Sequence, residues 1–322
     1  MKAIVVSAPG DPDQLALTDV PDPLPGNDEI LVSVIAAGLN FIDTYHRSGL
    51  YPMEMPFTPG LEGAGTVLAV GPGVTQYQPG DSVCWTWAIG SYAEKVVIPA
   101  DQAIPLPEDV APTVAAALLL QGITAHYLAT DTFPLKEDDR CLIHAGAGGV
   151  GLLLTQIAKM AGAEVFTTVG SKEKAELSTG AGADHVILYN ETDFKEEVEE
   201  IAGPGAIDVV YDGVGAATFL KGLDLLRARG MLVTFGNASG PPPEISPLIL
   251  AGKGSLFLTR PTMAHYTATR QELLSRTTDL FDWVSEGRLD VRIGAEFALA
   301  DAAEAHRALE GRSTTGKVLI RP

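Results

Sequence analysis

The sequence predicts an α/β protein in which a β-rich part precedes a doubly wound parallel sheet. Two observations carry this prediction. Residues 141–162 read as a buried strand, a glycine-rich turn and an apolar-faced helix. Beyond them, short apolar and mostly β-branched runs alternate with helix-length segments, which is typical of a parallel sheet covered by helices on both faces. These runs are residues 164–169, 184–189, 207–212, 231–236 and 254–260, and the last of them would be the sixth strand.

The turn has the pattern G-x-G-x-x-G, with Gly146, Gly148 and Gly151 at its three glycine positions. We expect Gly146 to permit the tight turn, Gly148 to let the backbone approach a pyrophosphate, and Gly151 to let the helix pack closely on the strand. The helix N-terminus would then point at phosphate charge. An ordinary glycine-rich turn is the alternative, but the flanking strand and helix favour a dinucleotide site.

The end of the second strand of this sheet indicates which nicotinamide cofactor fits. NAD-binding folds usually place Asp or Glu there, roughly 20 residues beyond the turn, to bind the ribose hydroxyls. This chain instead has Ser171, followed by Lys172 and Lys174. A 2′-phosphate is therefore favoured, and NADP(H) is the expected cofactor. In the alternative, both lysines are solvated residues of the next helix, and Tyr189 only completes a core strand instead of covering the phosphate.

The part that precedes this sheet contains short apolar strands punctuated by Pro and Gly, which predicts an irregular β-rich domain. A helix is expected over residues 112–130, with a break at Gly122 near the domain boundary. After Pro261, a long helix, a short strand, a second helix and a final strand are expected to return to the first domain. The predicted domains are residues 1–121, completed by 262–322, and residues 122–261.

Composition excludes several classes of function. The chain has 322 residues, a hydrophobic fraction of 46% and a net charge of −19, which favours a folded, soluble protein and disfavours nucleic acid or an anionic membrane as partner. The longest apolar stretch, residues 114–120, is too short to span a bilayer, so we expect a cytoplasmic protein. The two cysteines, Cys84 and Cys141, lie in apolar runs and read as reduced structural residues.

Short motifs run along almost the whole chain in one order. They are N-F-I-D-T-Y-H-R-S-G-L-Y-P at 40–52, P-G-L-E-G-A-G-T-V at 59–67, H-A-G-A-G-G-V-G at 144–151, V-V-Y-D-G-V-G at 209–215, F-G-N-A-S-G at 235–240, T-R-P-T at 259–262 and T-T-G-K at 314–317. This set resembles the zinc-free quinone oxidoreductases of the medium-chain dehydrogenase/reductase superfamily, the group that includes ζ-crystallin and bacterial NADPH:quinone reductases. Gly146 stands where that bacterial subgroup commonly has Ala, which should only ease the turn.

The resemblance implies a GroES-like β-rich catalytic domain, a Rossmann NADPH-binding domain and no zinc. Zinc-dependent relatives carry a catalytic Cys near position 40 and a G-H-E motif near position 60, whereas this chain has Asn40 and Gly60-Leu61-Glu62. A zinc lobe of four cysteines is also excluded by the cysteine count. The residues that the resemblance and the glycine motif place around the cofactor are Phe41, Ile42, Tyr45, Thr124, Tyr127, Gly146, Gly148, Gly149, Val150, Gly170, Ser171, Lys174, Tyr189, Gly213, Phe235, Gly236, Asn237, Arg260 and Arg312.

The implied chemistry is hydride transfer to an electron-poor acceptor, for which the protein supplies orientation and a dry site. Asn40, Tyr45 and Tyr51 are the polar candidates beside the acceptor, because an amide and two phenols can donate hydrogen bonds to developing oxyanion charge. Asn40 could equally hold the loop through the backbone, and Tyr51 could only pack. Asp43 is expected to cap a short helix that ends at Gly49, and His46 and His126 are expected to be structural.

Three functions fit the sequence. The first is NADPH-dependent quinone reduction. The second keeps scaffold and cofactor but reduces the activated double bond of an enone, and the third is a non-catalytic, crystallin-like NADPH-binding protein. A homodimer is expected from the resemblance, through the edge strand at residues 254–260, which has few of the charges that usually protect such an edge.

Overall fold

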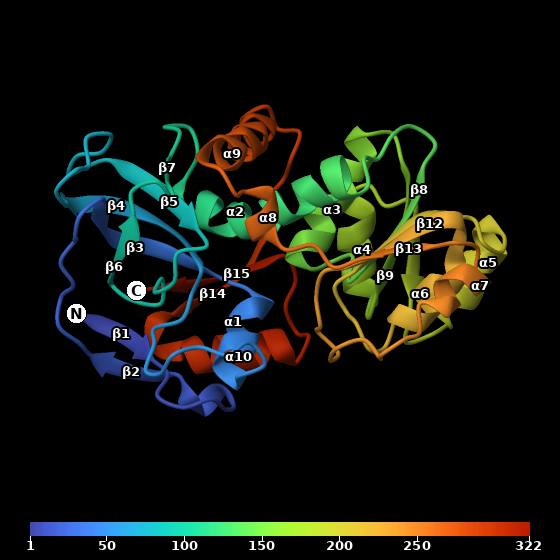
Figure 1. Cartoon of the computed structure of the whole chain (residues 1–322), viewed down its shortest axis with the longest axis horizontal. Coiled ribbons are helices and arrows are strands. Elements are labelled where there is room, and N and C mark those ends of the chain that lie inside the picture. The colour runs from blue at the N-terminus through green and yellow to red at the C-terminus, as the bar shows by residue number, and fades with distance from the viewer. The chain divides into compact units, whose positions relative to one another are not determined.

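The chain divides into two units in the computed structural model, which describes residues 1–322 (Figure 1). Unit 1 consists of residues 1–120, 268–287 and 291–322, and unit 2 of residues 121–267 and 288–290. The expected domain boundaries were at 121/122 and 261/262. The first lies within one residue of the observed boundary, and the second is six residues too early. Residues 262–267 belong to unit 2 because Tyr266 stacks on Tyr127 there, with ring centroids 4.2 Å apart.

Unit 1 is built around a mainly antiparallel sheet of seven strands. The strand order is β14-β15-β3-β4-β5-β7, and β6 also pairs with β3. A separate hairpin joins β1 and β2. The strands are β1 (Lys2–Val5), β2 (Ala16–Asp19), β3 (Glu29–Leu39), β4 (Glu62–Val70), β5 (Ser82–Thr86), β6 (Lys95–Pro99), β7 (Ala103–Pro105), β14 (Ile293–Ala298) and β15 (Lys317–Arg321).

The C-terminal strand of the chain lies inside this first unit. β15 pairs antiparallel with β3, with Val318 opposite Leu39, which confirms that the tail returns. The helical elements of unit 1 are η1 (Pro12–Gln14), α1 (Phe41–Ser48), α9 (Arg270–Ser285), η3 (Leu299–Asp301) and α10 (Ala302–Glu310), and α2 (Pro112–Tyr127) begins in it.

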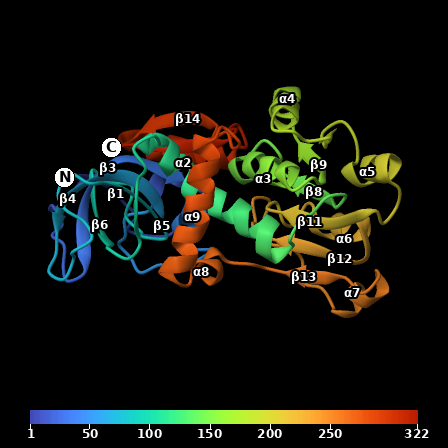
Figure 2. The same ribbon diagram turned by 90° about the horizontal axis from the view of Figure 1, so that it is seen from above.

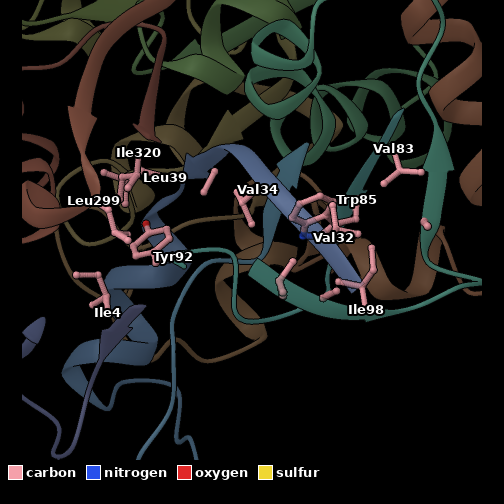
Figure 3. Close-up of a cluster of buried hydrophobic side chains, with 14 of the residues drawn as sticks. Ile4, Val32, Val34, Leu39, Val83, Trp85, Tyr92, Ile98, Leu299 and Ile320 are labelled. Atoms are coloured by element: carbon pink, nitrogen blue, oxygen red, sulfur yellow. The ribbon is translucent and has the colours of Figure 1, made fainter. Parts of the chain in front are cut away.

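An apolar cluster packs between the strands of unit 1 and the segment of η3 and α10 (Figure 3). It includes Trp85 and Tyr92, two large side chains that are fully buried. Each has a polar partner: the indole Nε1 of Trp85 donates to Oγ of Ser91 at 2.9 Å, while the Tyr92 hydroxyl reaches α1 and α10. Burial of Tyr92 therefore connects the core to the polar groups described below.

Unit 2 contains a parallel sheet with the strand order β10-β9-β8-β11-β12-β13. Numbered along this unit, that is 3-2-1-4-5-6, the order of a dinucleotide-binding doubly wound fold. The predicted α/β class with a six-stranded parallel sheet is confirmed. The strands are β8 (Arg140–His144), β9 (Glu164–Val169), β10 (His185–Leu188), β11 (Ile207–Asp212), β12 (Leu226–Thr234) and β13 (Phe257–Thr259).

Helices cover both faces of this sheet. α3 contacts α4, and α5 contacts α6 on the other side of the strands (Figure 1), while β13 forms the free edge beside β12 (Figure 2). The helical elements are η2 (Leu128–Thr132), α3 (Gly149–Met160), α4 (Lys172–Gly180), α5 (Phe194–Ala202), α6 (Phe219–Leu225), α7 (Leu248–Gly252) and α8 (Met263–Tyr266).

α2 (Pro112–Tyr127) lies within the range expected for a helix, residues 112–130, but lacks the expected break. It runs through Gly122 without a break, and irregularity begins only at the π-helical turn η2. Residues 112–132 reach the length and hydropathy of a membrane span. However, 72% of the apolar 18-residue window within them is buried inside the protein. This is the pattern of a core helix, in which apolar residues face protein on several sides.

Candidate functional site

The glycine-rich turn of unit 2 joins β8 to α3, as predicted, but Gly146 has a different structural role from the one expected. The left-handed residue is Ala145, with φ of 56°. Gly146 is needed for close packing, because a Cβ there would lie 2.6 Å from Cβ of Thr167 and 2.8 Å from Oγ of Ser178. The expectation that Gly146 permits the turn and merely eases it relative to Ala is therefore wrong for this chain.

Close approach also explains the third glycine. A Cβ on Gly151 would lie 2.3 Å from the carbonyl oxygen of Ala145, so only glycine lets α3 pack against the turn. Gly148 is the extended N-cap of α3 and has no side chain to occupy the helix end. The first N–H groups of any helix lack intrahelical partners and carry partial positive charge, and Gly149 and Val150 lie at this position. The cradle suits a pyrophosphate.

The end of β9 brings together the residues expected at a 2′-phosphate. Ser171 is the N-cap of α4, and its Oγ accepts a hydrogen bond from the backbone N–H of Lys174 at 3.3 Å. A Cβ on Gly170 would lie 2.6 Å from the Tyr189 hydroxyl, so Gly170, Ser171 and Tyr189 are neighbours although they end different strands.

The N-terminus of α4 also carries a carboxylate, Glu173, to which the sequence analysis gave no role. Glu173 lies between the two lysines, and hydrogen bonds from its own backbone N–H and from the Ser171 hydroxyl lower the pKa of its carboxyl. Glu173 therefore competes for the Ser171 hydroxyl, while Lys172 and Lys174 flank it in sequence. The lysines outnumber this acid, so the position still favours an anionic phosphate.

β11 and β12 lie on the other side of β8 from β9, and their carboxyl ends belong to the same edge of the sheet. A buried carboxylate, Asp212, accepts from the N–H groups of Val214 and Gly215 at 2.7 and 3.0 Å and from the Thr218 hydroxyl at 2.9 Å. These bonds fix the turn that contains Gly213. Asp212 was quoted in a motif but given no role by the sequence reading.

The turn after β12 packs directly on that of β11. A Cβ on Gly236 would lie 2.4 Å from the Gly213 carbonyl oxygen, and a Cβ on Gly213 would lie 3.0 Å from the Phe235 ring. Arg260 donates to the Gly236 carbonyl at 3.1 Å, and the amide oxygen of Asn237 accepts from Arg260 at 3.2 Å. The structure thus groups Gly213, Phe235, Gly236, Asn237 and Arg260 at one edge of the sheet, where open α/β sheets bind ligands.

Two further predicted residues of unit 2, Thr124 and Tyr127, lie on α2. Both are buried, and Tyr127 stacks on Tyr266 with ring planes 8° apart. The remaining predicted residues, Phe41, Ile42, Tyr45 and Arg312, belong to unit 1. Of these, Arg312 has a left-handed backbone with φ of 57° just after α10.

In unit 1 the candidate acceptor residues lie on and beside α1. The Tyr45 and Tyr51 rings meet edge to face with centroids 5.2 Å apart, and Phe41 lies 6.4 Å from Tyr45. Tyr51 is held by its backbone N–H, which donates to the Tyr45 carbonyl at 3.1 Å. Phe41 and Tyr45 lie one turn apart on α1, and Tyr51 lies beyond the end of the helix, so the three aromatic side chains form one group across the end of α1.

Asn40 is the N-cap of α1, and its amide is fully engaged. Nδ2 donates to Oε2 of Glu62 at 2.9 Å and to the Gly38 carbonyl at 3.2 Å, and Oδ1 accepts from Nζ of Lys317 at 2.8 Å. Both amide hydrogens are therefore used inside unit 1. This favours the alternative in which Asn40 holds the loop over the one in which it donates to an acceptor.

A buried ion pair accompanies Asn40. Lys317 is 1% exposed and Glu62 is fully buried, and the two are hydrogen bonded to each other. Burial lowers the pKa of the Lys317 ammonium, and the Glu62 carboxylate opposes that effect. Both residues appeared in sequence motifs, but no role was assigned to them.

Asp43 caps α1, as expected. Its Oδ2 accepts from the backbone N–H of Asn40 at 2.9 Å, and the helix ends at Gly49 with φ of 81°. The same Oδ2 accepts from the Tyr92 hydroxyl at 3.0 Å. Burial raises the pKa of Asp43 to about 7, although these hydrogen bonds and Lys317 oppose the shift.

The hydrogen-bonded chain continues from Tyr92 to α10. Nε2 of His306 lies 3.3 Å from the Tyr92 hydroxyl, and Nη1 of Arg47 lies 3.1 Å from Nδ1 of His306. Because arginine only donates, Nδ1 accepts and Nε2 carries the hydrogen. Arg47 also forms two hydrogen bonds with Glu310. Burial, reinforced by the Arg47 charge, lowers the pKa of His306 to about 3.

Comparisons with known proteins agree with this architecture. Residues 26–108 match the alcohol dehydrogenase GroES-like domain, and residues 149–283 match the zinc-binding dehydrogenase domain. The chain is 42% identical to a quinone oxidoreductase of Pseudomonas aeruginosa over 100% of this chain and 99% of the relative. It is 40% identical to a 2-haloacrylate reductase of a Burkholderia species over 99% of this chain and 98% of the relative.

A solved structure agrees as well. The Escherichia coli quinone oxidoreductase complexed with NADPH is 41% identical and matches 100% of both chains with a TM-score of 0.98. The similarity covers both units. The chain belongs to the quinone oxidoreductase family of the medium-chain dehydrogenase/reductases.

Proposed function

We propose that this chain reduces quinones with NADPH by hydride transfer, without zinc. One observation carries the choice of cofactor: Gly170, Ser171 and Tyr189 are neighbours at the end of β9, and Lys174 follows in the first turn of α4. Hydroxyl and ammonium groups at a helix N-terminus are suited to a phosphate. A relative whose structure holds NADPH shares the fold over its whole length.

The glycine turn passes a simple test of fit. Gly151 is required by a contact of 2.3 Å with the Ala145 carbonyl oxygen, which keeps α3 close to the turn, and Gly146 is required by contacts under 3 Å with Thr167 of β9 and Ser178 of α4. Gly148, Gly149 and Val150 would bind the pyrophosphate, Ser171 and Lys174 the 2′-phosphate, and Phe235, Gly236 and Asn237 the nicotinamide end. When bound, NADPH supplies the hydride. Phe41, Ile42, Tyr45, Thr124, Tyr127, Gly213, Arg260 and Arg312 stay predicted contacts.

For the acceptor, the phenols of Tyr45 and Tyr51 are the proposed donors, because both amide hydrogens of Asn40 are used elsewhere. Their rings and that of Phe41 offer flat apolar contact to a planar ring. A quinone needs no Lewis acid, since its oxygens become a stabilised aromatic alkoxide as charge arrives. The cation Lys317 already lies between Asn40 and Glu62, the positions that match the zinc motif of relatives.

Steady-state NADPH oxidation at 340 nm tests the proposal with 1,4-benzoquinone, 9,10-phenanthrenequinone and an enone. Turnover of the quinones supports it. The second function, reduction of an activated double bond, is favoured by the similarity to a 2-haloacrylate reductase, and turnover of the enone alone would establish it. Tight NADPH binding without turnover of any acceptor would support the non-catalytic alternative.

We further propose a homodimer that pairs through β13. Phe257 and Leu258 of this edge strand are 56% and 37% exposed, and unprotected apolar edges invite pairing. A cytoplasmic location is proposed as well, supported by two buried cysteines that are both free thiols.

A further inference from the structure

Three adjacent strands of unit 1 end at one buried polar cluster. Val318 lies opposite Leu39 and Ala37 lies opposite Gly63, so the next positions place Lys317 opposite Asn40 and Glu62 opposite Gly38, and the Asn40 side chain reaches Glu62 at 2.9 Å. We call Lys317, Asn40 and Glu62 the Lys317 cluster. All three side chains are buried, with exposed fractions of 1%, 4% and 0% respectively.

The hydrogen bonds of the Lys317 cluster fix the Asn40 amide in one orientation. An ammonium only donates and a carboxylate only accepts. The amide oxygen must therefore face Lys317, at 2.8 Å, and the amide nitrogen must face Glu62, at 2.9 Å. The other oxygen of Glu62 accepts from the backbone N–H of Leu120 at 2.7 Å, which holds the carboxylate in turn.

The Lys317 cluster requires glycine at position 38. A Cβ on Gly38 would lie 2.4 Å from Oε2 of Glu62, 2.6 Å from Cε of Lys317 and 2.4 Å from the Ala116 carbonyl oxygen. No L side chain fits between these groups without moving them. The ion pair therefore lies in close contact with β3 and α2.

The Lys317 cluster contacts α1 through the N-cap residue of the helix. Asn40 is the N-cap, and its backbone N–H is held by Asp43 at 2.9 Å. Both the side chain and the backbone of Asn40 are therefore fixed. The helix that begins there carries Phe41 and Tyr45, and Tyr51 packs edge to face on Tyr45.

We propose that Lys317 is a positioning residue for acceptor reduction, which sets the orientation of Tyr45 and Tyr51 by holding Asn40 at the start of α1. The inference rests on the proposed function, because these aromatic residues are the proposed acceptor contacts. A shift of about 1 Å in a positioned group can lower a rate by about 100-fold. Lys317 itself touches no reacting atom in this account.

The test compares Lys317→Met, Glu62→Gln and the double variant with wild type. Lys317→Met alone leaves a buried carboxylate without its cation and should lower the Tm. The double variant removes both charges with little change in volume and should recover the Tm. Lys2→Met is the matched control, because Lys2 pairs with Asp19 on the surface, where the two side chains are 48% and 78% exposed.

We expect Lys317→Met and the double variant to lose at least about tenfold in kcat/KM for 9,10-phenanthrenequinone. The Kd for NADPH should rise by a smaller factor, because most of the proposed cofactor contacts lie in unit 2 and not on α1. Recovery of kcat/KM together with the Tm in the double variant would overturn the inference, as would an unchanged kcat/KM in Lys317→Met or an equal loss of NADPH affinity. If Lys317→Met does not fold, the double variant alone decides.

A second readout separates this inference from the proposed function. Binding of 9,10-phenanthrenequinone to cofactor-free protein, followed by tryptophan fluorescence quenching, should weaken at least about tenfold in the double variant and stay unchanged in Lys2→Met. If wild type binds NADPH but reduces no quinone, the proposed function fails. Equal quinone binding by wild type and the double variant would instead refute the role of Lys317.

Discussion

The Tyr92 hydroxyl donates to Oδ2 of Asp43 at 3.0 Å, inside a core where both side chains are fully buried. The same hydroxyl oxygen lies 3.3 Å from Nε2 of His306. The phenol of Tyr92 thus contacts both a buried acid and a buried base. Burial disfavours the charged form of each, so their pKa values move in opposite directions, Asp43 up to about 7 and His306 down to about 3.

These two groups should make opposite contributions to stability as pH changes. The folded-state pKa of Asp43 lies above its ordinary value of 3.8, so its contribution is present below that value and is lost as the pH rises toward 7. The pKa of His306 lies below its ordinary value of 6.5, so its contribution is present above 6.5 and is lost as the pH falls toward 3. Between pH 4 and 6.5 the two slopes oppose each other.

Single substitutions should expose each slope. In Asp43→Asn, His306 remains, and the Tm should rise more steeply with pH between 4 and 6.5 than in wild type. In His306→Gln, Asp43 remains, and the Tm should fall with pH over the same window. Calorimetric scans at several pH values measure both slopes. Parallel pH profiles for the two variants would refute the assignment.

Gly151→Ala should destabilise unit 2 by about 1–3 kcal/mol, because the new Cβ would meet the Ala145 carbonyl oxygen at 2.3 Å. It should also weaken NADPH binding by moving α3 away from the turn. Gly180→Ala is the control: nothing lies within 4 Å of its Cβ, and Ala at this helical position should be neutral or stabilise by up to about 1 kcal/mol. Equal Tm values for both variants would contradict the packing role of Gly151.

Lys174→Ala should raise the Kd for NADPH about tenfold and leave that for NADH nearly unchanged, since only NADPH carries the 2′-phosphate. Fluorescence titration of the reduced cofactors measures both constants. Lys195→Ala serves as control, because Lys195 pairs with Glu199 on α5. A similar loss for both cofactors would place Lys174 elsewhere than at the phosphate.

Phe257→Lys should convert the proposed dimer to a monomer, since it places a charge on the exposed edge strand β13. Light scattering gives the mass. Leu24→Lys is the control, at an 85% exposed leucine of unit 1. A wild-type protein that is monomeric at micromolar concentration, or a dimer that survives Phe257→Lys, would exclude β13 as the interface.

The fold was largely predictable because local patterns determine it. β9 and β11 have the bounds that their β-branched runs predict, Glu164–Val169 and Ile207–Asp212, and the alternation with helices implies the parallel sheet. The break expected at Gly122 was wrong, because burial of the apolar faces of α2 outweighs the low helix propensity of one glycine.

The site was predictable only where its residues are contiguous. Gly146, Gly148 and Gly151 could be recognised from spacing, but not that Ala145 adopts the left-handed conformation or that Thr167 requires a glycine at 146. Those facts depend on the neighbouring strand. The Lys317 cluster joins three positions far apart in the sequence, and only the strand register brings them together.

The most direct test of the central claim is the rate of NADPH oxidation with 9,10-phenanthrenequinone, measured beside the rate with NADH. The proposed function predicts turnover with a strong preference for NADPH. Absence of turnover with this and other quinones, in a protein that binds NADPH, would contradict it, and a preference for NADH would contradict the phosphate site at Ser171 and Lys174.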